Sequence, residues 1–463
     1  MKQRSAARVV VLAAGRGTRM RSRVAKIWHP VGGRSLLEHS LRTAESFGTG
    51  RPIVVVADLD GEGLAELGER AHLVRQADAR GTAAALAAAR PVLAGEEAVL
   101  VIPGDMPLLS AASLESLLRA LDEAEVGAAV LTAKVSNASG YGRVLRTAHG
   151  SLERIVEDAD EPWDGAPAEV NLGTYAFALP GLWESLDQLS ADNAQGELYL
   201  SWLPERVQGG AVTVEVVDPA EAIQVNDRVQ LAQAEAALQR RTQRRLMLAG
   251  VTITDPESTW IDCDVEVGQD TVIAPGTVIR GRTRIGSDCL IGPFAEMEDV
   301  DAGDGCRIGR SHLSGCKLAD GVDVGPFNRV RPESVLGPKS HLGTFTEVVR
   351  SQVGAGSQIP HLSYVGDAEV GQDVNYGAGS ITANWDGQVK HRTVIGDGAR
   401  LGSGTIMVAP VEVGVGAYSA AGSVITGDVP AGSLAVARTR QRNVLGWVAR
   451  RRRQGKSVAE EKS

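Results

Sequence analysis

The sequence is poor in aromatic residues and cysteines. Phe, Trp and Tyr make up only 4% of the 463 residues, so its cores must be packed mainly from small side chains. The four cysteines form no CxxC pair and have no histidine pair at zinc-ligand spacing, which disfavours a structural zinc site and favours free thiols in a reducing compartment. These cysteines are Cys263, Cys289, Cys306 and Cys316.

Long apolar runs and a surplus of positive charge are also missing. No stretch reaches the about 20 apolar residues that span a bilayer, and the run at 9–14 is too short for a signal-peptide core, so we expect a cytoplasmic protein. The formal net charge of −9 disfavours a general surface for nucleic acid or anionic membranes. The arginine run at 450–453 lies in a tail, 447–463, that we expect to be disordered. This basic cluster is either a solvated terminus or a site for nucleic acid or acidic lipid.

Glycine, in contrast, is abundant: 54 of 463 residues, against a usual ~7%. Residues 1–226 alternate apolar strand candidates with Ala- and Leu-rich helical segments, which predicts an α/β Rossmann-like domain with a mostly parallel sheet covered on both faces. The candidate strands are 8–12, 52–57, 98–102, 128–134, 174–178 and 212–217. Residues 227–250 predict one long polar linker helix that ends in glycine.

From 251 to 446 the pattern changes, because apolar residues recur every six positions. The clearest register is Ile395, Leu401, Met407, Val413, Ser419 and Ile425, with a small or β-branched residue four places after each of the first five. This period is typical of an all-β parallel β-helix of hexapeptide repeats, in which three repeats close one coil. Successive coils then stack at about 4.8 Å.

The first predicted strand runs into a glycine-rich loop, LAAGRGTRM at 12–20. Such glycines let the backbone approach a phosphate, and Arg19 and Lys26 supply counter-charge for a nucleoside triphosphate. The Walker A pattern is absent. Asp105 follows the strand candidate 98–102, where a carboxylate suits Mg²⁺ bound together with substrate phosphates. The alternatives are a tight turn with exposed basic residues and an aspartate that only caps a turn.

A second polar constellation interrupts the hexapeptide repeat. It consists of Arg331, His361, Tyr364, Asn375, Asn384, Trp385 and Lys390. Polar and titratable side chains that break a regular repeat indicate a binding or catalytic site. The simpler alternative for the histidine alone is a surface turn residue.

With these motifs in this order, the chain resembles the sugar-phosphate nucleotidyltransferases. With the hexapeptide half attached, it resembles the family of bacterial bifunctional UDP-N-acetylglucosamine pyrophosphorylase / glucosamine-1-phosphate N-acetyltransferases over about residues 8–447. Further motifs that carry the resemblance are GDMPL at 104–108, GYGR at 140–143 and NAQGE at 193–197. The resemblance implies an N-terminal nucleotidyltransferase domain and a C-terminal left-handed β-helix acetyltransferase domain. It also implies a homotrimer with acetyl sites between subunits.

The same resemblance implies the substrates glucosamine 1-phosphate, N-acetylglucosamine 1-phosphate, UTP and acetyl-CoA, with Mg²⁺ as cofactor, in UDP-N-acetylglucosamine synthesis for the cell wall. Arg19 and Lys26 would be catalytic, and Asp105 and Asn226 would bind the metal. The nucleotide and sugar would be held by Leu12, Ala13, Ala14, Gly15, Lys26, Gln76, Gly81, Thr82, Asp105, Gly142, Glu157, Asn171 and Asn226, with Gln76 and Gly81 near the uracil.

In the acetyltransferase half, the resemblance implies His361 as the general base that takes a proton from the C2 amine of glucosamine 1-phosphate. The acetyl acceptor would be held by Arg331, His361, Tyr364, Asn375 and Asn384. The acetyl-CoA groove would be lined by Ala378, Asn384, Trp385, Ser403, Ala421 and Arg438.

Several positions depart from the family pattern. Val349 stands where the family has a lysine for the substrate phosphate. Arg350 follows it, but adjacent strand residues point to opposite faces, so a replacement requires a local slip of register. Leu172 removes a hydroxyl that could face the sugar, and Ala84 and Trp202 replace further polar side chains. Two other interpretations therefore stay open: a related nucleotidyltransferase with altered or lost acetyltransferase activity, and a non-catalytic ligand-sensing scaffold.

Overall fold

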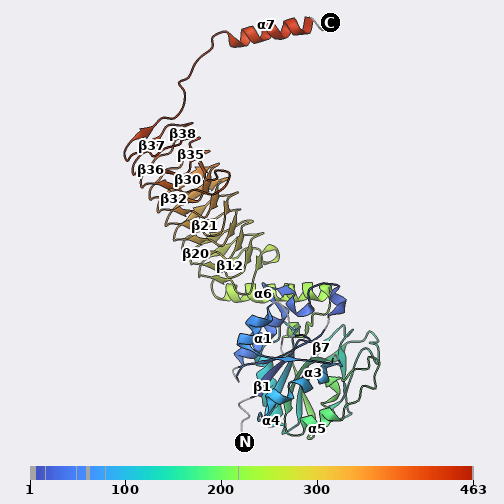
Figure 1. The fold of residues 1–463 in the computed structure, drawn as a ribbon. Helices are drawn as coiled ribbons and strands as arrows, with labels where there is room; N and C mark the ends of the chain where they lie inside the picture. The colour runs from blue at the N-terminus through green and yellow to red at the C-terminus, as the bar shows by residue number, and fades with distance from the viewer. Residues whose placement is uncertain are drawn as a thin grey trace. The chain divides into compact units, whose positions relative to one another are not determined.

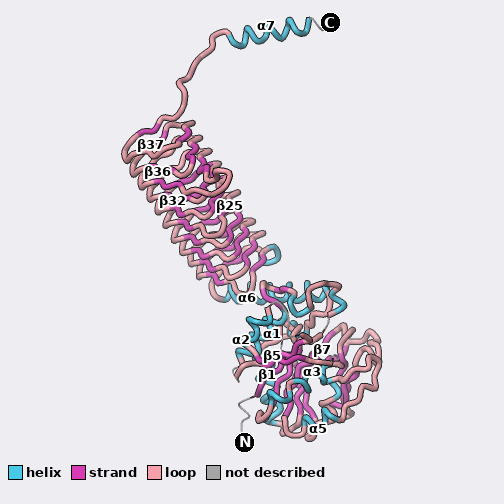
Figure 2. Tube along the Cα trace, in the orientation of Figure 1, coloured by secondary structure: helices cyan, strands magenta, loops and turns pink. Residues whose placement is uncertain are grey.

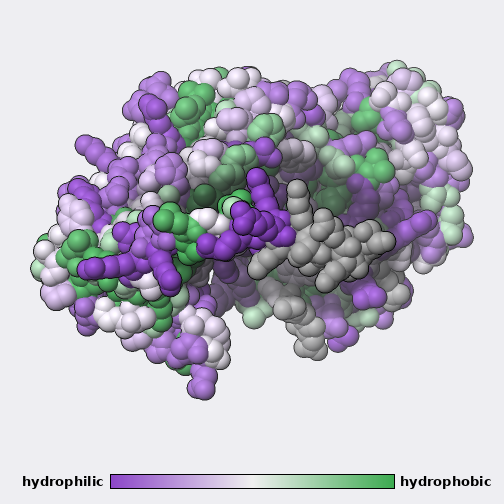
Figure 3. Space-filling view, turned by 90° about the horizontal axis from the view of Figure 1, so that it is seen from above, coloured by the Kyte–Doolittle hydropathy of each residue, from purple (hydrophilic) through white to green (hydrophobic). Residues whose placement is uncertain are grey.

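The computed structural model describes residues 7–15, 17–47, 50–58, 63–78, 80–216 and 218–460, with side chains up to residue 453. The chain forms two units (Figure 1), Met1–Arg245 with Ile261–Cys263, and Leu246–Trp260 with Asp264–Ser463. This division falls within the predicted linker segment. No helix in the described part of the chain is long and apolar enough to cross a membrane. On the face shown in Figure 3, hydrophobic side chains occur in small groups among hydrophilic ones.

The first unit is built on one mixed sheet with the strand order β11-β7-β10-β6-β1-β4-β5. These strands are β1 (Ala7–Leu12), β4 (Ile53–Val56), β5 (His72–Arg75), β6 (Ala98–Pro103), β7 (Ala128–Val135), β10 (Ala168–Ala178) and β11 (Ala211–Glu215). All six predicted strands are present within a few residues, although Val217 lies outside the described residues. The sheet is not uniformly parallel, because β10 runs antiparallel to both β6 and β7 and also pairs with the hairpin β8 (Gly142–Arg146) and β9 (Leu152–Val156).

Helices cover both faces of this sheet, as predicted. Along β1, Val9 and Val11 belong to one buried cluster and Val10 to another, because successive strand residues point to opposite faces. The first cluster includes buried leucines of α1 (Leu36–Ser46), α2 (Leu64–Arg70) and α4 (Ala111–Glu123), and the second those of α3 (Thr82–Ala88) and α5 (Leu182–Asp187). A short hairpin of β2 (Pro30–Val31) and β3 (Arg34–Ser35) precedes α1.

The predicted linker segment forms α6 (Arg228–Leu248). Its first half packs within the first unit, where Ala234, Ala237 and Leu238 are buried against Val225 and Leu36. Gly250, just after the helix, has a φ of +97° and donates its N–H to the carbonyl of Met247, 3.1 Å away, which ends the helix.

The second unit is a parallel β-helix whose short strands stack in three faces (Figure 2). The first face holds β12 (Thr252–Ile253), β15 (Val272–Ile273), β18 (Leu290–Ile291), β21 (Arg307–Ile308), β24 (Asp323–Val324), β27 (His341–Thr344) and β30 (Gln358–His361), and β37 (Tyr418–Ser419) pairs with β39 (Leu434–Ala435). The second holds β13 (Trp260–Ile261), β16 (Val278–Arg280), β19 (Glu296–Glu298), β22 (His312–Ser314), β25 (Arg329–Val330), β28 (Glu347–Val349), β31 (Tyr364–Gly366), β33 (Ile381–Ala383), β35 (Ile406–Val408) and β38 (Val424–Ile425). The third holds β14 (Glu266–Val267), β17 (Arg284–Ile285), β20 (Asp301–Ala302), β23 (Lys317–Leu318), β26 (Val335–Leu336), β29 (Gln352–Val353), β32 (Ala368–Val370), β34 (Thr393–Ile395) and β36 (Val411–Val413).

The predicted six-residue register is confirmed by burial. Ile395, Leu401, Met407, Val413 and Ile425 point into the prism and are at most 3% exposed. The chain turns between faces at corner residues in the left-handed conformation, which glycine adopts without strain. Several corners nevertheless carry larger residues, among them Phe327, Glu333, Arg350 and Asp367 with φ between 44° and 66°.

The tail differs from its prediction. Where the sequence predicts disorder, the structure has a helix, α7 (Trp447–Glu460). Its side chains are exposed as far as they are described, to Arg453.

Candidate active sites

The first unit contains a cavity of about 710 Å³ at the carboxyl ends of β1 and β6. All of the residues that the sequence predicts for the nucleotide and sugar line it, and so does Arg19. They are Leu12, Ala13, Ala14, Gly15, Gln76, Gly81, Thr82, Asp105, Gly142, Glu157, Asn171 and Asn226, together with Lys26. Residues as far apart in sequence as 12 and 226 therefore share one cavity.

The glycine-rich loop crosses this edge of the sheet and lies against Lys26. The N–H of Ala13 bonds the carbonyl of Val55 at 2.8 Å, which continues the sheet into the loop. Gly17 has a φ of +61°, and a Cβ there would come within 2.5 Å of the Lys26 Cβ. The second glycine of the loop is thus needed both for its backbone conformation and for the close approach of Lys26. Arg16 lies outside the described residues.

Lys26 joins two oxygens that come from distant parts of the chain. Its Nζ forms a very short contact with Asp105 and lies 3.1 Å from Oδ1 of Asn226. The N–H of Val225 donates to the backbone carbonyl of Asp105 at 3.0 Å, which holds the two segments together. A carboxylate and an amide oxygen are hard ligands of the kind that Mg²⁺ takes, with phosphates and waters completing its shell. Asp105 and Asn226 therefore have the ligand chemistry that would fit a divalent cation.

Polar side chains that form hydrogen bonds with one another make up the opposite wall of the cavity. Burial raises the pKa of Glu157, although the hydroxyl of Ser201 donates a short hydrogen bond to its carboxylate. The Nδ2 group of Asn171 donates to the Tyr175 hydroxyl at 2.6 Å. A Cβ at Gly142 would come within 3.1 Å of Glu157 Oε1, so this glycine keeps the wall open.

One sequence-based expectation about this wall is wrong. Leu172 is 2% exposed, belongs to the hydrophobic core and does not line the cavity, whereas its neighbours Asn171 and Gly173 do. A hydroxyl at this position would therefore point into the core and not toward the sugar.

The cavity also includes residues that the sequence does not predict for it. Tyr141 donates its hydroxyl to the carbonyl of Ala222 at 2.8 Å, and Gln224 donates to Asp105 Oδ1 at 3.3 Å. Tyr175 and Ser201 line the same wall. The signal for Tyr141 was its place between two glycines of the GYGR motif, and that for Ser201 was its place after NAQGE.

The second unit places four of the predicted acetyltransferase residues on one corner of the β-helix. His361, Ala378, Ser403 and Ala421 stand in successive coils, each directly before a corner residue. The N–H groups of Gly379, Gly404 and Gly422 donate to the carbonyls of His361, Ala378 and Ser403 at 3.2, 2.7 and 2.8 Å.

The residue type at this corner changes at His361, from large side chains in the coils just before it to glycine in the coils after it. In the coils before it, the corner residues include Phe294, Phe327 and Phe345, all about half exposed, and Arg310 lies over the first two rings. The rings of Phe327 and Phe345 stack with centroids 5.2 Å apart. After His361 and Leu362, the corner positions are the glycines Gly379, Gly404 and Gly422, which carry no side chain at the turn itself.

The remaining predicted residues lie on both sides of this corner. Asn375 bridges to Gln358 on the first face, whereas Arg331 and Tyr364 belong to the second. Arg331 pairs with Glu347 at 3.4 Å. Asn384 and Trp385 begin a loop that leaves the coil, in which Trp385 is 57% exposed. Arg438 is exposed after β39.

Comparison with known proteins agrees with this architecture. Residues 9–205 match the MobA-like NTP transferase domain, and residues 264–299 match the bacterial transferase hexapeptide (six repeats). The fold and the two polar sites thus define a nucleotidyltransferase fused to a left-handed β-helix transferase.

Close relatives over the full length identify the family. The protein named "Bifunctional protein GlmU" of Mycolicibacterium gilvum (strain PYR-GCK) is 44% identical over 98% of this chain and 94% of its own. The GlmU protein of Brevibacillus brevis (strain 47) is 43% identical over 96% of this chain and 98% of its own. The chain belongs to the bifunctional GlmU family. It transfers acetyl from acetyl-CoA to glucosamine 1-phosphate and uridylyl from UTP to N-acetylglucosamine 1-phosphate in the synthesis of UDP-N-acetylglucosamine.

Proposed function

We propose that uridylyl transfer takes place in the cavity of the first unit. UTP would lie on the glycine-rich loop, with its uracil near Gln76 and Gly81 and its phosphates against Arg19 and Lys26. N-acetylglucosamine 1-phosphate would lie against the wall formed by Gly142, Glu157 and Asn171. The observation that carries this assignment is the convergence of Lys26, Asp105 and Asn226 in one cavity.

Catalysis at this site would consist of positioning and charge neutralisation. The sugar phosphate oxygen would attack the α-phosphorus of UTP in line, and pyrophosphate would leave. Lys26 and Arg19 would hold the negative charge that moves onto the departing group. Asp105 and Asn226 would hold Mg²⁺, which supplies a further positive charge against the phosphates.

Acetyl transfer would take place at the corner of the β-helix. His361 would accept a proton from the C2 amine of glucosamine 1-phosphate as the nitrogen attacks the thioester carbonyl, and coenzyme A would leave as the thiol. The corner has glycines in the coils after His361. This is consistent with an extended coenzyme A that lies along the edge formed by Ala378, Ser403 and Ala421. At about 4.8 Å per coil, this edge extends roughly 14 Å from the histidine. The exposed ring of Trp385 would cover one side of this edge.

We further propose that the protein is a homotrimer. Two features support this assembly. The aromatic edge formed by Phe294, Phe327 and Phe345 is exposed in the single chain, and an exposed patch of this kind is typical of an interface. The acetyl-site residues also divide between two faces around a corner, which leaves the site open for a neighbouring subunit to complete. Sedimentation analysis should therefore give about three times the 48.6 kDa of one chain, and a monomeric mass would contradict this part of the proposal.

Two assays on the purified protein with Mg²⁺ test the site assignments. One contains glucosamine 1-phosphate and acetyl-CoA and follows free thiol, and the other contains N-acetylglucosamine 1-phosphate and UTP and follows pyrophosphate. We expect His361→Ala to abolish thiol release and leave pyrophosphate release intact, and Asp105→Ala to do the reverse. The activity that each variant retains thus shows that the unit without the substitution is still folded. Pyrophosphate release without thiol release by the wild-type protein would instead favour the alternative of an altered or lost acetyltransferase activity, for which Val349 is the motivating residue.

A further inference from the structure

The acetyl-acceptor side of the corner lacks a lysine where the family has one. Val349 is the last residue of β28 and pairs in register with Gly366 of β31. Its neighbour Val348 points into the prism, so Val349 lies on the outer face, yet it is only 2% exposed. An apolar, covered side chain cannot bind a phosphate, so a sugar phosphate held here needs a cation from another position.

The next residue, Arg350, is presented to the outer surface without any slip of register. The pairs Glu347–Tyr364, Val348–Val365 and Val349–Gly366 are continuous, so β28 is regular to its end. Arg350 is the corner residue and has a φ of +44°, in the left-handed region. The alternation of strand side chains therefore ends at Val349, and the corner turns the arginine outward, where its side chain is 32% exposed.

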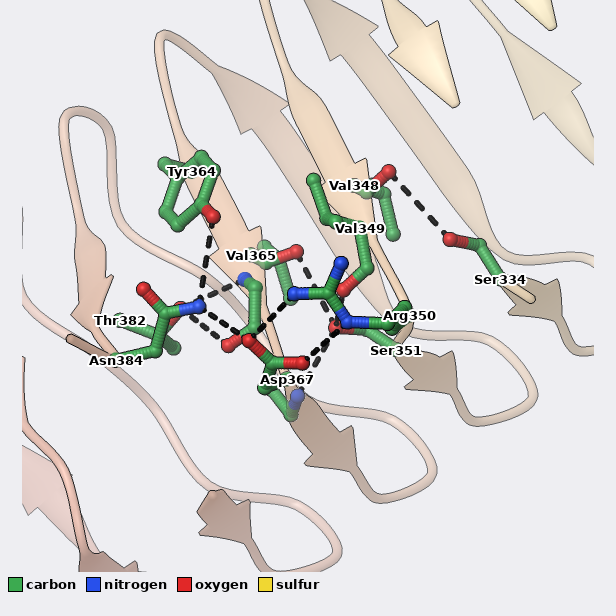
Figure 4. A network of polar contacts seen from close by, with 12 residues as sticks. Ser334, Val348, Val349, Arg350, Ser351, Tyr364, Val365, Asp367, Thr382 and Asn384 are labelled. Atoms are coloured by element: carbon green, nitrogen blue, oxygen red, sulfur yellow. Dashed lines mark hydrogen bonds and ion pairs between the residues drawn. The ribbon is translucent and has the colours of Figure 1, made fainter. Parts of the chain in front are cut away.

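Hydrogen bonds connect Arg350 to the predicted sugar-binding residues (Figure 4). Its Nε and Nη2 donate to the two carboxylate oxygens of Asp367 at 2.7 and 2.9 Å. Asp367 Oδ2 also accepts from Asn384 Nδ2 at 2.5 Å, and the same Nδ2 lies 3.5 Å from the Tyr364 hydroxyl. A single carboxylate thus separates the guanidinium from two residues of the acetyl-acceptor set.

Charged groups of both signs surround this network, and one donor of Arg350 stays free in the part of the chain that the structure describes. Arg350 lowers the pKa of Asp367 mainly through their hydrogen bonds, and Lys390 acts in the same direction by its charge. Arg331 faces Glu347 at 3.4 Å. Glu333 also acts on Arg350 by its charge, so three cations stand against three carboxylates before a phosphate binds. The bonds to Asp367 use Nε and Nη2, and Nη1 has no hydrogen-bond partner among the described residues.

We propose that Arg350 binds the phosphate of the acetyl acceptor and so performs in this chain the role for which Val349 has no charge. This inference rests on the proposed acetyl transfer to glucosamine 1-phosphate. The bidentate bond to Asp367 fixes the guanidinium, and its remaining donors face the phosphate. Asp367 is a positioning residue in this arrangement, because it orients both Arg350 and Asn384.

Steady-state kinetics of thiol release by the full-length protein test this proposal. Arg350→Ala should raise the KM for glucosamine 1-phosphate roughly 10- to 100-fold, as expected for the loss of charge-assisted hydrogen bonds. The KM for acetyl-CoA and the rate of pyrophosphate release should stay unchanged, because neither involves this phosphate. Arg284→Ala is the matched control, since Arg284 also pairs with a carboxylate of the neighbouring coil, Glu266, at 3.3 Å. It should leave both KM values unaltered.

A second variant separates phosphate binding from a structural role. Adding Val349→Lys to Arg350→Ala should restore most of the lost affinity, because it returns a cation to the adjacent position. Arg350→Gln, which keeps a donor for Asp367, should lose affinity like Arg350→Ala if charge is what matters. The inference would be overturned if Arg350→Ala kept the wild-type KM for glucosamine 1-phosphate. It would also be overturned if Val349→Lys failed to lower the raised KM of Arg350→Ala. Absence of thiol release in the wild-type protein would instead overturn the proposed acetyl transfer itself.

Discussion

The Lys26 ammonium occupies the place between two oxygens that suit a metal ion, and this predicts an exchange of partners during uridylyl transfer. In the structure, Lys26 binds Asp105 and Asn226. If UTP and Mg²⁺ bind as proposed, the ammonium would move to the phosphates and release both oxygens. Lys26→Met should therefore weaken the use of UTP and, at the same time, strengthen metal binding to the nucleotide-free protein.

The magnitude follows from the contact that the ammonium makes. Lys26 and Asp105 are both largely buried, with side chains 12% and 9% exposed, so solvent screens their interaction only weakly. A hydrogen bond between charged groups of this kind contributes about 1.5–3 kcal/mol. Removing this competitor should tighten Mg²⁺ or Mn²⁺ binding roughly 10- to 150-fold, and kcat/KM for UTP should fall by at least the same factor.

Titration calorimetry with Mn²⁺ on the nucleotide-free protein measures the first effect, and pyrophosphate release measures the second. Lys134→Met is the matched control, because Lys134 is 71% exposed, pairs with Glu215 and does not line the cavity. It should change neither quantity. A lower UTP efficiency in Lys26→Met with unchanged or weaker Mn²⁺ affinity would refute the exchange of partners.

Three further outcomes follow from the described contacts. Leu172→Thr should lower the free energy of unfolding by about 1–3 kcal/mol, because it buries a hydroxyl, and it should not improve KM for N-acetylglucosamine 1-phosphate. Tyr175→Phe removes the acceptor of the Asn171 amide, worth about 1 kcal/mol, so this KM should rise roughly fivefold. The pKa of Asp367 is lowered by Arg350, so Asp367→Asn should destabilise the protein at neutral pH, and this difference, followed by chemical denaturation, should vanish as the pH falls through the lowered pKa.

The convergence of these residues on the cavity of the first unit was predictable because they sit in short local patterns. A glycine-rich loop after a strand, and an aspartate after the neighbouring strand, indicate a ligand site at the carboxyl edge of a sheet from local sequence alone. The direction of β10 was not predictable in this way, because an apolar strand has the same pattern whether it runs parallel or antiparallel. The position of Leu172 also escaped, because the pairing of β10 with β7 shifts between Asn171 and Tyr175. Such an irregularity changes which side chains share a face.

The β-helix was predictable in its core and less so at its corners. The six-residue period fixes which residues point inward, and burial of Ile395 and Met407 follows directly. The period does not say which non-glycine residues take the left-handed conformation at a turn. Arg350 shows the consequence. The alternation of side chains along a strand would point Arg350 into the prism, whereas its left-handed corner conformation turns it outward. Its link to Asp367 joins two coils and could not be deduced from spacing alone.

Along the corner that carries His361, equivalent positions recur once per coil and are therefore evenly spaced. Because each coil adds about 4.8 Å, the distance from His361 to an equivalent position further along this corner can change only by whole coils. An insertion of one or two six-residue repeats would transfer every later residue to a different face, unless it is looped out, as the segment that starts at Asn384 is. If the acyl donor lies along this corner as proposed, the length of donor that the enzyme accepts would be set by the number of coils that follow the histidine.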